Sequence, residues 1–485
     1  MSFRIALVPL DDRPCNYQYL QDLVAIAGLK LSSLAPTDSF EKRAKWLENT
    51  LSNKDALIVN LEGWLYGSLI HSRKMEISES ETEARLLKLS ELLNQHPQVQ
   101  IYLSSVLLRL SITLNAEQSE RNWRDVFRFS TLKGKENLTS SEVNELHETE
   151  ARIPPSILHE YLSVRERNHR IQLKAVQLFS KRARFFVFGQ EDCAPHGLHV
   201  KEKEAIRDAV IESKEAPRFQ ILTGADELGA ALLARAYSDH LGVSKLQLGV
   251  WTSDPSTLKM ISKYEDIPVY ENLRLHAELC YFQLLGLDDR KLKESDPRLL
   301  IQCFSPQGQS DLCFKPSPIS ENVEFPLVSL LKPNDAVLDL SHANGADPGF
   351  MKAVIKKNLP SAFSAWNTTG NRMGTLFAHL SFQILSKKSN AYCESADRSV
   401  RNRSLLDDFL YQSIVRQKLQ DQAERESCNP WALGPRHAEY SAACQEEMLS
   451  AIREFGFSTE FLDFRATLPW PRLFEVLLRD AYLLE

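Results

Sequence analysis

The chain has 485 residues, of which 43% are hydrophobic and 25% charged, so it can bury a large core and is not a wholly disordered protein. Its 58 basic and 64 acidic residues give a net charge of −6, which argues against nucleic-acid binding because such proteins carry a surplus of basic charge. No apolar run reaches the length of about 18 residues that a membrane-spanning helix needs.

Short apolar runs that end in polar or acidic residues recur along the chain. The eight clearest are Ile5–Leu10, Ala56–Leu61, Gln100–Leu103, Phe185–Phe188, Phe219–Leu222, Leu246–Trp251, Ala336–Leu340 and Ala362–Trp366. Apolar runs of this length without alternation are typical of parallel strands that are buried on both faces. Lys30–Leu34 and Leu299–Cys303 are two further candidates for strands.

Residues with helical spacing fill the stretches between these runs. They predict helices over Glu202–Glu212 and Leu228–Leu241, and Pro154-Pro155, which suits a first helical turn, opens another that continues to Phe179. Alternating strands and helices predict an α/β fold. Eight such units with acids at the strand ends favour a (β/α)8-like barrel, and a doubly wound parallel sheet is the alternative.

The pattern changes after residue 394. Ser404–Glu424 and His437–Phe455 are amphipathic, and a last helix is expected from Pro471. We therefore predict an α/β catalytic domain over residues 1–394 and a helical C-terminal region over residues 395–485. A segment rich in Pro, Ser and Asp near residues 287–333 is predicted to be an insertion in the first domain.

The segment Gly224–Glu227 follows a predicted strand and precedes a predicted helix. Its glycine permits a tight exit from the strand, and adjacent side chains such as Asp226 and Glu227 point in different directions, so they can serve different tasks at one site. Glycosidic cleavage needs one protonated carboxyl and a second group that stabilises the oxocarbenium ion. An ordinary helix start, where acids face the positive end of the helix dipole, explains the same pattern equally well.

Glu191 and Asp192 end another predicted strand, at the edge where α/β proteins usually place their active sites. They are candidates for binding substrate hydroxyls or for supplying a second acid, and a helix cap or loop salt bridge is the alternative. The nearby His196 and His199 raise the question of a metal site, but no third ligand has a fixed spacing. We therefore predict neither a metal nor a cofactor.

Asp11, Asp12 and Arg13 follow the first predicted strand. An arginine beside two acids indicates an ion-paired loop, which either holds sugar hydroxyls or orients another residue. A buried structural salt bridge is an equally good interpretation of the same three residues.

Polar loops also follow two of the later predicted strands. Asn344 and Asp347 lie in one of them, and Trp366 and Asn367 end the last strand. Tryptophan faces stack on sugar rings, and asparagine side chains bind hydroxyls or amides. These four residues are therefore candidates for sugar binding, although core or rim packing is the more common role of a tryptophan.

Five ordered motifs carry a resemblance to one bacterial family. They are Leu7–Asn16, Gly189–Asp192, Gly224–Glu227, Ala343–Asp347 and Ala365–Asn371. In this order they resemble domain-of-unknown-function family 4127, and Pro469–Arg472 extends the resemblance into the tail. Relatives commonly have Gln-Asp-Asp where this chain has Gln190-Glu191-Asp192. The resemblance implies a bacterial protein and does not imply a particular activity.

A second resemblance concerns one motif alone. Gly224–Glu227 is similar to the Gly-Gly-Asp-Glu strand end of the barrel β-N-acetylhexosaminidases. That resemblance implies that Asp226 orients the acetamido group of the substrate and that Glu227 is the general acid.

We therefore predict a glycoside hydrolase that is exo-acting on N-acetylhexosaminides by a substrate-assisted mechanism. The predicted catalytic residues are Asp226 and Glu227, and the predicted substrate-binding residues are Asp11, Asp12, Arg13, Glu191, Asp192, Asn344, Asp347, Trp366 and Asn367. One alternative is a metal-dependent hydrolase that uses Asp11, Asp192, His196 and His342. The other is a sugar-binding protein without enzymatic activity.

The expected surroundings of the protein follow from its composition. The N-terminus shows no signal-peptide pattern, so a cytoplasmic location is expected. The eight cysteines are scattered without a Cys-x-x-Cys pair, which predicts reduced thiols. The predicted partner is a small carbohydrate, neither nucleic acid nor a membrane is expected, and a homo-oligomer is left open.

Overall fold

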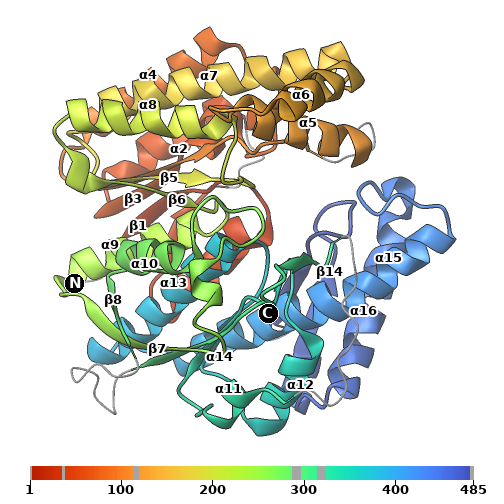
Figure 1. The fold of residues 1–485 in the computed structure, drawn as a ribbon. Coiled ribbons are helices and arrows are strands. Elements are labelled where there is room, and N and C mark those ends of the chain that lie inside the picture. Colours follow the sequence, from red (N-terminus) through yellow and green to blue (C-terminus); the bar gives the residue numbers. More distant parts are fainter. Residues whose placement is uncertain (1–2, 35–38, 114–119, 287–296, 314–323, 481–485) are drawn as a thin grey trace. The chain divides into compact units, whose positions relative to one another are not determined.

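The computed structural model describes residues 3–34, 39–113, 120–286, 297–313 and 324–480, which divide into two compact units. Unit 1 comprises Met1–Val24, Leu29–His240 and Tyr264–Ile267, and unit 2 comprises Ala25–Gly28, Leu241–Lys263 and Pro268–Glu485. In Figure 1 the ribbon follows the chain from unit 1, in red to yellow-green, into unit 2, in green to blue.

A parallel sheet of six strands forms the centre of unit 1. Its strands, in spatial order, are β2 (Leu31–Ser33), β1 (Ile5–Val8), β3 (Ala56–Asn60), β4 (Gln100–Leu107), β5 (Phe185–Gln190) and β6 (Phe219–Thr223). Every residue of β1, β3 and β5 is buried, which explains why these strands are apolar without alternation.

Helices cover the sheet of unit 1. The long ones are α1 (Gln18–Ala25), α2 (Phe40–Leu51), α4 (Glu79–Gln95), α5 (Glu120–Lys133), α6 (Ser140–Arg152), α7 (Pro155–Phe179), α8 (Leu198–Glu212) and α9 (Leu228–Leu241), and α3 (Leu61–Tyr66) is short. The apolar faces of α2, α4, α7 and α8 share one core cluster with the strands. Figure 1 shows α4, α7 and α8 on one side of this sheet and α9 on the other.

A parallel sheet of five strands forms the centre of unit 2. Its strands, in spatial order, are β8 (Phe282–Leu285), β7 (Leu246–Thr252), β9 (Arg298–Gln302), β11 (Ala336–Asp339) and β13 (Ala362–Ser364). Counted along the chain within each unit, both sheets read 2-1-3-4-5, and unit 1 adds a sixth strand. The two units therefore share one strand topology.

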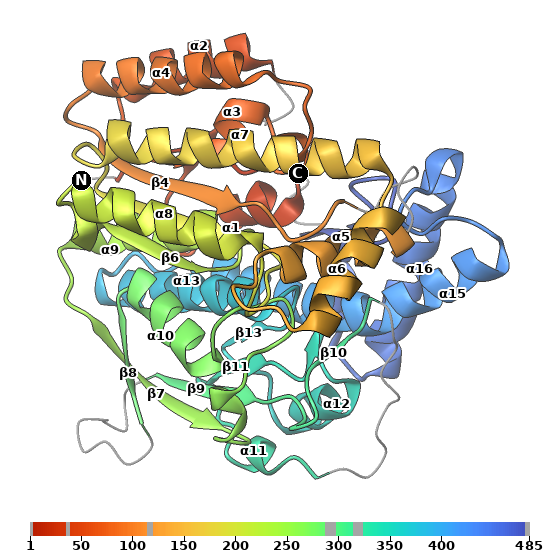
Figure 2. The same cartoon turned by 45° about the horizontal axis from the view of Figure 1, so that its top comes forward.

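Helices pack on both sides of the second sheet, as Figure 2 shows for α10 and α13 on one side and α11 and α12 on the other. The helices of unit 2 are α10 (Val269–Leu279), α11 (Pro326–Ser329), α12 (Pro348–Lys357), α13 (Thr369–Lys388), α14 (Glu394–Ser404), α15 (Arg416–Arg425) and α16 (His437–Glu454). A π-helix, Leu405–Val415, joins α14 to α15. Two short pairings complete the unit, parallel β10 (Ser310–Asp311) with β12 (His342–Ala343) and antiparallel β14 (Phe464–Thr467) with β15 (Leu477–Asp480).

The structure confirms the parallel α/β fold but not the (β/α)8-like barrel. Within the described residues each sheet is open, with β2 and β6 at the edges of the first and β8 and β13 at the edges of the second. Barrel strands and the inner strands of an open sheet are both buried on two faces, so their sequences look alike. The arrangement follows the open alternative, with helices on both faces.

Two further predictions concern the later part of the chain. Part of the predicted insertion at 287–333 lies outside the described residues, and the rest contains β9, an inner strand of the second sheet. The helix expected from Pro471 is wrong, because the chain there leads into strand β15. None of the helices described is long and apolar enough to cross a lipid bilayer.

Candidate functional site

The polar residues of unit 1 gather where its parallel strands end. Residues 11–13 follow β1, Glu62 follows β3, residues 191 and 192 follow β5, and residues 226 and 227 follow β6. After β1 the chain forms β2 on one side of it, and the next strand, β3, lies on the other side, so the strand order reverses at β1. In open α/β sheets ligands bind outside the carboxyl ends of the strands at such a reversal. The topology therefore places the candidate site at this edge.

A buried arginine links two acids at this edge. Arg13 donates to Asp11 through Nε at 3.0 Å and Nη2 at 2.7 Å, and to Asp226 through Nη1 at 3.2 Å. The amide of Asn16 donates to Asp11 Oδ1 at 2.8 Å and to Asp226 Oδ1 at 3.2 Å. All four side chains are buried. Asp11, Arg13 and Asp226 thus form one network, although 213 positions separate Arg13 from Asp226.

The surroundings push the pKa values of the two acids in opposite directions. Burial acts to raise the pKa of Asp11, but the charge and hydrogen bonds of Arg13 and the bond from Asn16 outweigh it, and the pKa lies below its usual value. Burial raises the pKa of Asp226 to about 6, against the attraction of Arg13 and with help from the negative charge of Asp11. Near neutral pH this pair contains one firmly ionised carboxyl and one that takes up a proton readily.

Glu62 is a third buried acid at the same edge. Its Oε1 accepts hydrogen bonds from Ser105 Oγ at 2.7 Å and from the Val106 amide at 2.9 Å, and its Oε2 has no hydrogen-bond partner among the residues described. Burial raises the pKa of Glu62 to about 7 against these bonds, and the charge of Glu191 adds to the rise. Glu62 can therefore donate or accept a proton at neutral pH.

Glu227 folds back over the turn that follows β6. Gly224 has φ +112°, and a Cβ at this position would collide with the Glu227 carboxyl. Only glycine leaves room for both this backbone conformation and this side chain. Glu227 is 1% exposed and directly precedes α9. The structure therefore contains both features that the motif indicated, a helix start and two buried adjacent acids.

Two arginines hold the acids that follow β5. Arg73 pairs with Glu191, and Arg109 pairs with Asp192. Arg109 Nη1 also lies 4.0 Å from Glu191 Oε1, so one chain of alternating charges runs through all four side chains. Glu191, Asp192 and Asp12 are only partly buried, whereas Asp226 is buried. The accessible side of the site therefore lies at the loops after β1 and β5.

A second group of side chains lies beyond Asp192. Cys193, His199 near the start of α8 and Asp266 bring one thiol, one imidazole and one carboxylate within 4.8 Å of one another. The Lys203 ammonium contacts Asp266 Oδ2, and the Gln190 amide donates to Oδ1 at 3.3 Å. Burial and the charge of Asp266 raise the pKa of the Cys193 thiol well above its usual value, so Cys193 alone is no ready nucleophile.

The remaining predicted sugar-binding residues belong to unit 2. Asn344 and Asn367, at φ +62° and +67°, come together through a hydrogen bond from the Asn344 amide to the Asn367 carbonyl at 3.0 Å. Asp347 is the N-cap of α12 and accepts from the Phe350 amide at 2.7 Å. The ring of Trp366 packs against Phe474, with 6.1 Å between centroids. Backbone conformation, capping and packing thus account for much of what these residues do.

The ligand set of the metal-dependent alternative is engaged in other contacts. Asp11 is held by Arg13, and Asp192 pairs with Arg109. His196 is exposed, and His342, in unit 2, lies 2.6 Å from Ser310 Oγ through Nδ1. Asp11, Asp192 and His196 belong to unit 1 and His342 to unit 2, so no single unit contains the whole set.

Sequence reasoning missed Glu62 as a site residue, as well as the roles of Arg73, Arg109 and Asp266. Glu62 carries a usable signal, since it is an acid directly after a buried apolar run. Arg73 and Arg109 are ordinary polar residues in the sequence, and their partners are distant along the chain. Asp266 lies in Tyr264–Ile267, the short segment in which the chain re-enters unit 1, and the sequence of this segment has no helical or strand periodicity.

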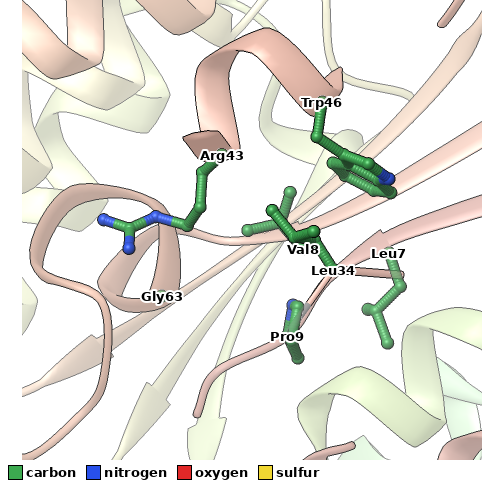
Figure 3. A pocket seen from close by; sticks show the side chains of 7 residues that line it. All are labelled: Leu7, Val8, Pro9, Leu34, Arg43, Trp46 and Gly63. Atoms are coloured by element: carbon green, nitrogen blue, oxygen red, sulfur yellow. The ribbon is translucent and has the colours of Figure 1, made fainter. Parts of the chain in front are cut away.

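An apolar pocket lies beside the end of β1. Its lining residues are Leu7, Val8, Pro9, Leu34, Arg43, Trp46 and Gly63. Figure 3 shows Arg43 and Trp46 on opposite sides of Val8, with Pro9 below them. None of these residues is among the predicted site residues. The pocket is lined mostly by apolar side chains, so it offers little to a hydroxylated ligand.

The sequence model described as "protein of unknown function (DUF4127)" matches residues 5–479. The chain belongs to this family. Membership in family 4127 thus covers both units and extends well beyond residue 371, where the main motifs end. No curated protein matches the chain.

Proposed function

We propose that this member of family 4127 is a glycoside hydrolase whose active site lies at the carboxyl edge of the first sheet. The observation that carries the proposal is the buried pair of adjacent acids after β6, in which Gly224 leaves room for the Glu227 carboxyl while Arg13 and Asn16 hold Asp226. Cleaving a glycosidic bond requires both a carboxyl that gives up a proton and a negative charge close to the anomeric carbon. Two adjacent acids in different surroundings are how one site provides both.

The more specific proposal is a substrate-assisted reaction on N-acetylhexosaminides. Glu227 would protonate the leaving oxygen while the acetamido oxygen of the substrate attacks the anomeric carbon. Asp226, which is fixed by Arg13 and Asn16, would accept the N–H of the acetamido group and keep it in place. Glu227 would then accept a proton from the water that opens the cyclic intermediate. Asp12, Glu191 and Asp192 are the accessible acids for the sugar hydroxyls, and the eight free cysteines accord with a cytoplasmic location.

The test is a panel of nitrophenyl glycosides, each offered with and without the 2-acetamido group. We expect turnover of the acetamido sugars only, and a fall in kcat of about 10²- to 10⁴-fold in Glu227→Gln, which is the usual contribution of a general acid. Asp226→Asn should lose activity similarly. Asp254→Asn is the matched control, because Asp254 also follows a strand but caps its own loop in unit 2.

Three outcomes would count against the proposal in different ways. Equal turnover by Glu227→Gln removes that residue from its role, and equal turnover of sugars without the acetamido group removes the substrate-assisted route. No turnover of any sugar rejects the hydrolase. Saturable binding of a sugar in a thermal-shift titration, without product after long incubation, would favour the sugar-binding alternative instead.

A further inference from the structure

Cys193, His199 and Asp266 form a cluster that the proposed glycosidase chemistry does not use. Cys193 lies in the loop after β5, His199 lies in the first turn of α8, and Asp266 belongs to the four-residue segment Tyr264–Ile267 of unit 1. One potential ligand atom from each lies within 4.8 Å of the other two. Separate stretches of chain thus converge on one point.

The imidazole ring of His199 is buried, but its two nitrogens make no hydrogen bond of good geometry. His199 is 1% exposed, and neither ring nitrogen has a hydrogen-bond partner among the described residues. The nearest acidic atom, Asp266 Oδ2, lies 3.5 Å from Nε2. Most buried polar atoms are well hydrogen-bonded, so a buried imidazole held only by a 3.5 Å contact to Asp266 points to a ligand that the protein chain itself does not supply.

The types of donor atom select the ligand. A thiol sulfur, an imidazole nitrogen and a carboxylate oxygen together suit Zn²⁺, whereas Mg²⁺ and Ca²⁺ prefer oxygen donors alone. Three protein ligands are the usual number at zinc sites that keep a fourth position for water. We propose that Cys193, His199 and Asp266 bind one zinc ion.

The charges around the cluster favour a divalent cation. Three acids, Asp192, Glu265 and Asp266, act on the Cys193 sulfur, whereas Lys203 opposes them there and Arg165 and Lys203 act on His199. The Cys193 Sγ donates its proton to the Tyr264 carbonyl at 3.4 Å. When zinc binds, the sulfur forms a bond to the metal as a thiolate, and this proton is released to water.

Lys203 makes the proposal specific. It lies one helical turn after His199 on α8, and its ammonium contacts the same Asp266 oxygen that faces the histidine. The ammonium therefore competes with zinc for Asp266 Oδ2. Removing this positive charge should strengthen zinc binding, which a purely structural role of the cluster does not predict.

The experiment uses the full-length protein, freed of metal with a chelator and then titrated with Zn²⁺ against a competing indicator. We expect one zinc per chain by elemental analysis, and cobalt loading should give the absorption band of a thiolate–cobalt bond. Cys193→Ser, His199→Gln and Asp266→Asn should each weaken zinc binding by about a hundredfold or more, since even outer residues of zinc sites contribute tenfold to a hundredfold.

His196→Gln is the matched control, because His196 is exposed in the same loop and should leave zinc affinity unchanged. Lys203→Met should raise the affinity on the order of tenfold, as expected for removing one charge close to the metal. No stoichiometric zinc and no cobalt band in the wild-type protein would overturn the proposal, and this result does not depend on any variant folding. Unchanged affinity in Cys193→Ser and Asp266→Asn would also overturn it.

Discussion

Arg13 is the residue on which the buried acids of unit 1 depend. It neutralises Asp11 and Asp226 at once, and all three side chains are at most 7% exposed. A buried charge that loses its partner is strongly destabilising, because nothing replaces the water that it gave up on folding. The same arginine therefore supports both the fold and the position of Asp226 on which the proposed chemistry rests.

Replacing Arg13 with Met should destabilise the protein by about 3–5 kcal/mol at pH 7.5, because two buried carboxylates lose their counter-charge. The loss should be smaller at pH 5, where those carboxyls can take up protons instead. Urea unfolding at the two pH values, followed by fluorescence, measures both effects, and Arg13→Lys should lie between Arg13→Met and the wild type.

Arg4→Met is the matched control for this experiment. Arg4 pairs with Asp55, but their side chains are 48% and 35% exposed, so solvent screens the pair and the loss of Arg4 should cost little stability. If both variants lost equally little stability, the buried network around Arg13 would not have the importance that its geometry indicates.

At the level of elements, Asp347 shows how a predicted site residue can have a structural role. Its carboxylate caps α12, which begins with Pro348, and it also lies 3.4 Å from His342 Nε2. The sequence around it, polar residues followed by Pro and an amphipathic stretch, is typical of a helix start. Capping alone explains the position of this acid.

Asp347→Ala should therefore lower the stability of the protein by about 1 kcal/mol, whereas Asp347→Asn, which keeps an N-cap acceptor, should lose only a few tenths. The free energy of unfolding from urea curves distinguishes the two variants. If Asp347→Asn instead abolished sugar turnover while remaining stable, the residue would have a role in substrate binding as well as in capping.

The strands were the part of the fold that the sequence predicted best. All eight of the apolar runs correspond to strands, because strands buried on both faces must be continuously apolar. The two further candidates are β2 and β9. β8 was missed because its four residues follow α10 almost directly and add little to an already apolar stretch. β15 was mistaken for a helix because it is a short strand that depends on pairing with β14.

The site was predictable only where its contacts are local. Asp11 and Arg13 are two positions apart, and their ion pair was among the interpretations of the sequence. The contacts from Arg13 to Asp226, from Arg73 to Glu191 and from Lys203 to Asp266 join distant segments. Such contacts follow from strand order, and strand order leaves no periodic signal in the chain.

At the level of the whole molecule, two units repeat one strand order without a recognisable sequence repeat. An α/β unit needs only buried strands, amphipathic helices and short connections, so many different sequences satisfy the same order. For the same reason the sequence could not separate a barrel from open sheets. Each unit also has buried acids with raised pKa values, among them Glu62 in unit 1 and the adjacent Asp407 and Asp408 of the π-helix in unit 2.

These acids make the stability of both units depend on pH in the same direction. Burial raises the pKa of Glu62 to about 7, and burial together with the charge of Asp408 raises that of Asp407 to about 8. An unfolded carboxyl ionises near pH 4, so between pH 4 and these values the folded state holds protons that the unfolded state has lost. The free energy of unfolding must therefore fall as pH rises through this range.

Glu62→Gln and Asp407→Asn remove the titrating group from one unit each, so each should flatten the pH dependence of its own unit. Relative to the wild type, Glu62→Gln should gain about 3 kcal/mol of stability between pH 5 and pH 8.5, from a pKa difference of about 2.5 units. Differential scanning calorimetry over this range measures the effect. If the two units melt separately, each variant should shift a different transition, whereas equal shifts of one transition would show that the units unfold together. A pH profile unchanged by both variants would contradict the raised pKa values.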